Sequence, residues 1–235
     1  MLRGEVWVGA DGAAVADEAA RRFVALSKEA IAARGRFAVA LAGGSTPKAM
    51  YERLAKAPLR NDVDWSLVEV FFGDERTVPP NHPDSNYGMA ARALLDHVPL
   101  DRSRVHRMEG ERNPVEAARD YESVLKDRLG DHPIFDLILL GMGPDGHTAS
   151  LFPHTRALDE KTRLAVDNRV DKLNTTRLTL TIPVINSARA IVIACGAEKK
   201  PVFQAIAGQA EDPYQFPILF LRGAIAWLID TAAKP

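Results

Sequence analysis

The glycine-rich segment 141–153 places a carboxylate and an imidazole at a spacing that suits general acid–base chemistry. Asp145 and His147 are two residues apart, so their side chains can reach one another. A carboxylate that fixes the tautomer of a histidine leaves the second ring nitrogen free to take a proton from water. A histidine beside a glycine turn is more often structural, so the place of His147 in the fold must decide between the two interpretations.

The segment Gly43-Gly44-Ser45-Thr46-Pro47 has the composition of an anion-binding turn. Its glycines permit a close approach of the backbone to a ligand. Ser45 or Thr46 can cap a helix, and Pro47 suits the first helical turn. The free N–H groups and the dipole of such a helix favour phosphate. A well-capped turn without any ligand explains the same residues equally well.

The segment 73–76 and two later basic residues are further candidates for binding a charged ligand. Arg76 can bind a phosphate through two parallel hydrogen bonds, and Asp74 can orient a sugar hydroxyl or a catalytic partner. The alternative is a self-neutralising surface turn. Arg177 and Lys199 can each complete a phosphate site, although a lone basic residue is more often a solvated side chain.

Short apolar runs alternate with helical patterns along the chain. We expect strands at 5–8, 37–42, 68–72, 135–140, 177–182 and 190–195. We expect helices at 11–34, 47–57, 86–95, 114–129, 199–207 and 223–232, and a short helix that begins within 141–153. Continuous apolar strands between helices predict an α/β fold with a mostly parallel sheet covered on both faces. No linker divides the chain, so we expect a single domain over 1–235.

Three polar segments follow predicted strands, namely after Ala42, after Phe72 and after Leu140. In open α/β sheets, ligands bind at the carboxyl ends of the strands. We therefore expect these segments to meet in one crevice, and this position favours the catalytic interpretation of His147.

Composition excludes several classes of function. The 235 residues include 30 Lys and Arg against 31 Asp and Glu, which gives no electrostatic case for nucleic acid or an anionic membrane. No apolar run reaches the roughly 18 residues of a membrane span. Cys195 is the only cysteine, which suits a reducing compartment, and residues 1–10 do not resemble a signal peptide, so we expect a cytoplasmic protein. The histidines show no i, i+4 pair, so we expect no metal site.

A serine nucleophile is one alternative. Gly43-x-Ser45 approaches the G-x-S-x-G elbow of serine hydrolases, but Pro47 stands where the last glycine is needed for helix packing.

Several segments, in this order, together resemble the 6-phosphogluconolactonase family: 41–47, 72–76, 85–87, 141–153, 177–189 and Gly196-x-x-Lys199. The resemblance implies a Rossmann-like fold related to the glucosamine-6-phosphate deaminase and ribose-5-phosphate isomerase group. It also implies a cofactor-free hydrolase that converts 6-phospho-D-glucono-1,5-lactone to 6-phospho-D-gluconate in the oxidative pentose phosphate pathway, as a monomer or a homodimer.

The resemblance also assigns roles to residues that match. His147 is similar to the general base of the family, and Asp145 and Asp74 are similar to polar supports of the reacting end. By the same resemblance, the residues that bind the phosphate and the sugar of the substrate would be Gly43, Gly44, Ser45, Thr46, Arg76, Arg177 and Lys199.

The related deaminases are the nearest alternative. They resemble this chain around Asp-Gly-His but usually continue into Asn-Glu-Pro, whereas Leu151-Phe152-Pro153 lacks the glutamate. They also tend to carry tyrosine at the position of Arg76. A sugar-phosphate sensor would usually carry a DNA-binding module, and no such segment is visible. The stretch 216–220 is more apolar than the family's usual sequence, a departure that we expect to affect local packing or an interface there and not the active site.

Overall fold

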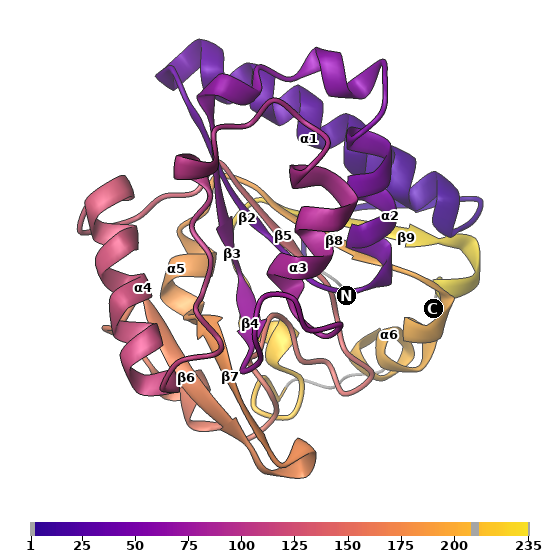
Figure 1. Ribbon diagram of the computed structural model, residues 1–235. Helices are drawn as coiled ribbons and strands as arrows, with labels where there is room; N and C mark the ends of the chain where they lie inside the picture. Colours follow the sequence, from indigo (N-terminus) through magenta and orange to yellow (C-terminus); the bar gives the residue numbers. More distant parts are fainter. Residues whose placement is uncertain (1–2, 208–211, 235) are drawn as a thin grey trace.

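A computed structural model describes residues 3–207 and 212–234 (Figure 1). Six parallel strands form the main sheet, in the order β1-β9-β8-β5-β2-β3. Their bounds are β1 Glu5–Gly9, β9 Ile225–Asp230, β8 Ile191–Cys195, β5 Leu137–Leu140, β2 Phe37–Leu41 and β3 Val68–Phe72. Every residue of β2, β3 and β5 is buried, which explains why β2 and β5 are continuous apolar runs in the sequence. The one charged residue of β3, Glu69, is paired with His106 and Arg128.

Helices cover both faces of this sheet, as the sequence predicts. α1 (Gly12–Arg34) and α2 (Ser45–Leu54) pack on the face that carries Val39 and Leu41. α4 (Pro114–Leu129), α5 (Ile182–Asn186) and α6 (Lys200–Ala207) pack on the opposite face with Ala38 and Ala40. Successive residues of one strand therefore serve two hydrophobic cores.

Local signals set several helix ends. The Asp11 side chain accepts the N–H of Ala14 at the start of α1, and Gly35 ends that helix with φ 70°. Asn113 caps α4, whose bounds match the predicted range 114–129. The predicted helix 86–95 is present as α3 (Asn86–Ala90) followed by a π-helical turn, Ala91–Leu95.

The prediction of a helix at 223–232 is wrong, because this segment contains β9. The strand pairs with β1 at one edge and with β8 at the other. Trp227 and Ile229 belong to one hydrophobic core and Leu228 to the other, so both faces are covered and the apolar run has no period of two. Trp227, in the middle of this strand, belongs to the core: its ring is buried and meets Phe203 edge-on at 5.6 Å.

A second, antiparallel sheet was not predicted. It has the order β4-β7-β6, with β4 at Asp74–Arg76, β7 at Thr175–Leu180 and β6 at Ala165–Val170. Only β7 corresponds to a predicted strand. The two sheets adjoin at Gly73, whose N–H donates to Leu41 of the main sheet and whose carbonyl accepts from Leu180 of the small sheet.

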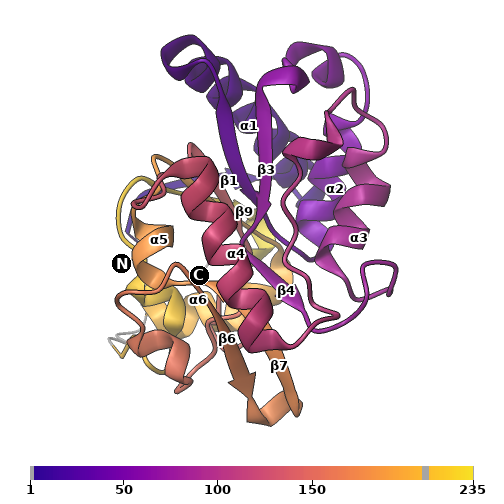
Figure 2. The same ribbon diagram turned by 60° about the vertical axis from the view of Figure 1, so that its left-hand side comes forward.

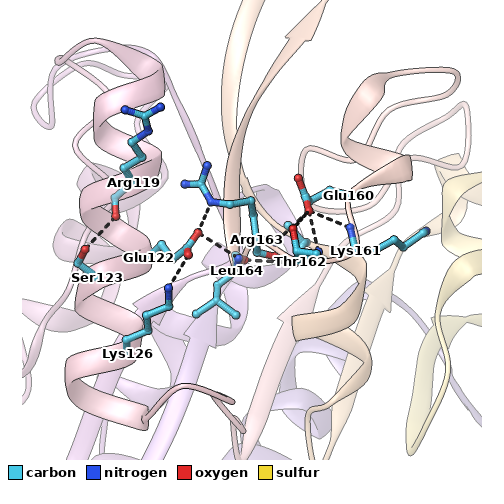
Figure 3. Close-up of polar contacts among 10 residues, drawn as sticks. Arg119, Glu122, Ser123, Lys126, Glu160, Lys161, Thr162, Arg163 and Leu164 are labelled. Carbon is cyan, nitrogen blue, oxygen red and sulfur yellow. Dashed lines mark hydrogen bonds and ion pairs between the residues drawn. The ribbon is translucent and has the colours of Figure 1, made fainter.

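The hairpin of β6 and β7 lies along α4 (Figure 2). Figure 3 shows how its beginning is fastened: Glu122 of α4 accepts hydrogen bonds from Lys126 at 2.7 Å, from Arg163 at 2.5 Å and from the N–H of Leu164 at 3.3 Å. In the preceding turn, Glu160 accepts backbone N–H groups of the next three residues. Because the hairpin carries pocket residues, these contacts also fix part of the pocket.

Within the described ranges, no helix is both long and apolar enough to cross a membrane.

Candidate active site

A pocket of about 460 Å³ opens at the carboxyl ends of β2, β3, β5 and β8. The predicted convergence of the three polar segments is therefore confirmed. The structure brings every predicted site residue to the lining of this one pocket: Gly43, Gly44, Ser45, Thr46, Asp74, Arg76, Asp145, His147, Arg177 and Lys199.

The carboxylate–imidazole contact that the spacing permits is present. His147 Nδ1 lies 2.5 Å from Asp145 Oδ1, and the backbone N–H of His147 donates to the same oxygen at 3.3 Å. The imidazole stacks on the ring of Phe152, with the centroids 4.0 Å apart. Nε2 has no protein hydrogen-bond partner in the part of the chain that the structure describes, and the side chain is 25% exposed. The ring therefore has one nitrogen held and one available.

The predicted short helix within 141–153 is absent, and an irregular turn takes its place. The N–H of Gly143 donates to the carbonyl of His147 at 2.8 Å, and the N–H of Gly146 donates back to Gly143 at 3.0 Å. Gly146 has φ 75° and Ala149 has φ 47°, so left-handed backbone breaks any helical run. A Cβ at Gly143 would lie 2.0 Å from the His147 ring, so the ring can keep its place only if this residue is glycine.

The apolar stretch 216–220 supports this turn from outside. The N–H of Ile218 donates to the carbonyl of Gly146 at 2.9 Å, and Phe216 lies directly against the α-carbon of Gly146. Ile218 itself is buried. Of the two uses expected for the stretch, local packing is the one that the structure displays.

Lys172 is a functional candidate that sequence reasoning missed. It lies in the turn between β6 and β7, lines the pocket, and donates from Nζ to Asp145 Oδ2. Burial disfavours the charged form of Asp145, but the hydrogen bonds from His147 and Lys172 outweigh it and hold the pKa of this carboxyl well below its usual range. The sequence could have indicated this lysine only through a predicted strand at 165–170, because the hairpin of β6 and β7 is what brings Lys172 to the pocket.

Asp74 ties three segments together beneath the pocket. Its carboxylate accepts from Ser150 Oγ at 2.6 Å and from Asn86 Nδ2 at 3.1 Å. Gly43 packs so closely on Asn86 that a Cβ there would lie 1.9 Å from the amide oxygen. These contacts connect the loop after β2, strand β4 and the turn 141–153, which carries His147.

The neighbouring carboxylate, Glu75, points away into the protein. It accepts from Ser85 Oγ and from the N–H groups of Asn86 and Tyr87 at 2.8–3.0 Å, at the start of α3. Burial raises the pKa of Glu75. Its work is structural, because it fixes the helix that carries Asn86.

Two arginines lie side by side on neighbouring strands of the small sheet. Arg76 and Arg177 are paired positions of β4 and β7, and both line the pocket. The Nε of each is buried without a hydrogen-bond partner among the described residues. Burial and the charge of Arg76 lower the pKa of Arg177. Two guanidinium groups held side by side repel one another, and an anion between them would relieve that repulsion.

The start of α2 differs from the prediction. Gly44, with φ 104°, occupies the capping position, and no side chain caps the helix, so neither Ser45 nor Thr46 has the expected capping role. The N–H groups of the first turn are left for a ligand, and the helix dipole favours an anion there. No hydrogen bond joins Ser45 to a histidine within residues 3–207 and 212–234, which disfavours the serine-nucleophile alternative.

The end of β8 supplies the last side of the pocket. Lys199 lines it, with Nζ 3.6 Å from Glu198 Oε1. Cys195 is buried beneath, and burial raises the pKa of its thiol to about 12, so it carries no nucleophilic role. Among the residues described, no three His, Cys, Asp or Glu side chains gather in a way that could hold a metal ion.

Comparisons with known proteins agree on one family. The family described as glucosamine-6-phosphate isomerases/6-phosphogluconolactonase matches residues 10–227. A 6-phosphogluconolactonase of Synechocystis sp. is 44% identical over 213 residues, which cover 87% of this chain and 86% of that protein. The structure titled 6-phosphogluconolactonase from Trypanosoma cruzi is 28% identical with a TM-score of 0.86, covering 98% and 96% of the two chains. A monomeric glucosamine-6-phosphate deaminase is 23% identical, with a TM-score of 0.79 over 97% and 98% of the chains, which shows a shared fold.

Proposed function

This chain belongs to the family of glucosamine-6-phosphate isomerases and 6-phosphogluconolactonases, and we propose that it hydrolyses 6-phospho-D-glucono-1,5-lactone to 6-phospho-D-gluconate, a step of the oxidative pentose phosphate pathway. One observation carries the proposal. A single pocket holds a carboxylate-bound imidazole and a pair of arginines whose buried nitrogens lack partners. The first can activate water, and the second can bind the phosphate of the substrate.

His147 is the general base in this scheme. Its free Nε2 takes a proton from water while the water oxygen attacks the lactone carbonyl carbon. Asp145 accepts the hydrogen bond of Nδ1–H and stabilises the imidazolium that forms. When the tetrahedral intermediate collapses, the bond to the ring oxygen breaks and the imidazolium returns its proton to that oxygen. One water is consumed, and a base so placed contributes about 10²–10⁴-fold.

The remaining predicted residues bind and orient. Arg76 and Arg177 offer donors to the phosphate, the uncapped start of α2 offers backbone N–H groups, and Lys199 adds a positive charge. Binding the phosphate at one end restricts how the lactone lies at the other, so binding energy supplies orientation at the carbonyl. Asp74 supports the catalytic turn through Ser150 and does not contact His147.

A deaminase is the main alternative, and the residues after His147 argue against it. The aromatic ring of Phe152 stacks on the imidazole, and the stretch 151–153 contains no carboxylate. Ammonia release from glucosamine 6-phosphate, at a rate comparable with lactone hydrolysis, would establish the alternative instead.

His147→Ala tests the base. Proton release from freshly prepared 6-phosphogluconolactone is followed with a pH indicator, and spontaneous hydrolysis is subtracted. We expect kcat to fall at least about 10²-fold with KM within a few-fold. His132→Ala, at an exposed position outside the pocket, is the control and should match the wild type. Wild-type turnover by His147→Ala would refute the assignment.

Arg76→Met tests the phosphate end. We expect KM for the phosphorylated lactone to rise at least tenfold while kcat changes little. The same variant should hydrolyse unphosphorylated glucono-1,5-lactone as the wild type does, because that substrate never uses the guanidinium. An unchanged KM for the phosphorylated lactone would remove Arg76 from the phosphate site.

A further inference from the structure

The turn between β6 and β7 brings a cation to the imidazole side of the pocket. Lys172 stands in this turn, within a short 3-10 segment, Asp171–Leu173. Its Nζ donates to Asp145 Oδ2 and lies 5.8 Å from the centre of the Phe152 ring, the same ring on which His147 stacks. Lys172 is therefore in contact with the support of the imidazole while its side chain is 55% exposed toward the pocket mouth.

The two oxygens of Asp145 have different partners. Oδ1 accepts from the ring and the backbone of His147, and Oδ2 accepts from Lys172. In the described ranges, Oδ2 has no other donor. A carboxylate bound at one oxygen can still rotate about its last torsion, whereas one bound at both oxygens has its plane fixed. The direction of its hydrogen bond to the imidazole is then fixed as well.

We infer that Lys172 is a positioning residue for lactone hydrolysis, and that it acts by holding the Asp145 carboxylate in the plane that aims Nε2 of His147 at the attacking water. The inference rests on the proposed role of His147 as base. It adds a residue from a part of the chain, the hairpin turn, that lies outside the glycine-rich catalytic segment.

Lys172→Met removes the charge and retains much of the side-chain length. We expect kcat to fall about tenfold, less than the roughly 10²-fold effect of a full 1 Å misplacement, because the Oδ1 contact remains. KM should stay within twofold. Lys172→Arg, which restores a donor and the charge, should recover most of kcat.

Arg169→Met is the matched control. Arg169 is on the same hairpin, is 50% exposed, and bonds Asp171 and Asn174 without touching Asp145. The control also removes one positive charge and one local contact of the turn. It should leave kcat and KM within experimental error of the wild type, and thermal unfolding of both variants shows whether the hairpin stays folded.

A second readout does not depend on turnover. ¹⁵N spectra of the imidazoles, with the His147 signals assigned by their loss in His147→Ala, report the tautomer and protonation of this ring directly. In Lys172→Met we expect a weaker Nδ1–H signal, because the Asp145 carboxylate that accepts this hydrogen bond is no longer held at its second oxygen. Unchanged His147 signals together with kcat within twofold of wild type would overturn the inference. So would a raised KM with unchanged kcat, which would make Lys172 a substrate contact.

These outcomes separate the inference from the proposed function. If His147→Ala retains activity, the proposed base is wrong whatever Lys172 does. If His147→Ala is inactive and Lys172→Met is indistinguishable from wild type in both readouts, the base stands and the positioning role fails.

Discussion

Adding one methyl group at Gly143 should displace the catalytic imidazole while leaving the backbone unstrained. A Cβ at this position would lie 2.0 Å from both Cε1 and Nδ1 of His147. Ordinary contact needs at least 3.4 Å, so the ring must shift by about 1.4 Å or rotate away from its place on Phe152. Gly143 does not have a positive φ, and alanine therefore adopts its backbone conformation without a local penalty.

The magnitude follows from that shift. A misplacement of about 1 Å in a reacting group costs on the order of 10²-fold in rate. We therefore expect Gly143→Ala to lower kcat about 10²-fold, with KM for the lactone within threefold because the phosphate end of the pocket is untouched. The melting temperature should change by only a few degrees, since the imidazole is partly exposed and can swing toward solvent.

The assay is proton release from fresh lactone at several concentrations, beside a thermal melt of each variant. Gly12→Ala is the control, because a Cβ there meets no protein atom within 4 Å and the residue, at the start of α1, does not line the pocket. Its kcat should stay within about threefold of wild type. Wild-type kcat for Gly143→Ala would refute the reasoning, because the present position of the His147 ring would then be irrelevant to turnover.

Three further outcomes are expected. Inorganic phosphate should inhibit the wild type competitively and inhibit Arg177→Met at least tenfold more weakly, because the guanidinium pair is incomplete; equal inhibition constants would contradict the phosphate site. Glu160→Gln should lower the free energy of unfolding by about 1 kcal/mol at pH 7. The effect is small because Glu160 is partly exposed and water weakens its hydrogen bonds. Hydrogen bonds from the N–H groups of Arg163 and Thr162 lower the pKa of Glu160 to about 2, so this stabilisation is complete above about pH 4.5 and lost as the pH falls toward 2; urea titrations that differ equally at pH 7 and pH 2 would contradict it. Cys195 should resist a thiol reagent at pH 8 in the folded enzyme and react after unfolding, because burial raises its pKa to about 12; fast labelling of the native protein would show the thiol to be accessible.

Much of the site could be predicted because it depends on where strands end. The segments after β2, β3 and β5 were assigned from apolar runs, and the carboxyl ends of parallel strands share one edge of a sheet. The pairing of Asp145 with His147 is also local, since two residues separate them. Such features need only short-range patterns and one general rule of topology.

The remaining features depend on contacts between distant segments. β9 was assigned as a helix because a six-residue strand covered on both faces has no alternation to distinguish it. β4 has three residues, too few for any periodic signal, and it forms by pairing with β7, a hundred residues later in the chain. The contact of Lys172 with Asp145 depends in turn on that small sheet. The sequence pattern favours Ser45 or Thr46 as the capping residue of α2. In the structure the helix already begins at Ser45, earlier than that pattern requires, with Gly44 at the capping position and no side-chain cap.

The contacts from Gly43 through Asn86 and Asp74 to Ser150 give the pocket a fixed length. Asn86, Asp74 and Ser150 are buried, and together these contacts join the loop that we propose faces the phosphate to the turn that we propose faces the carbonyl. Neither end can move along the substrate without disturbing the other. If the two ends act as proposed, the protein selects lactones by the separation between their phosphate and their carbonyl carbon, and we expect lactones of another length to be poor substrates.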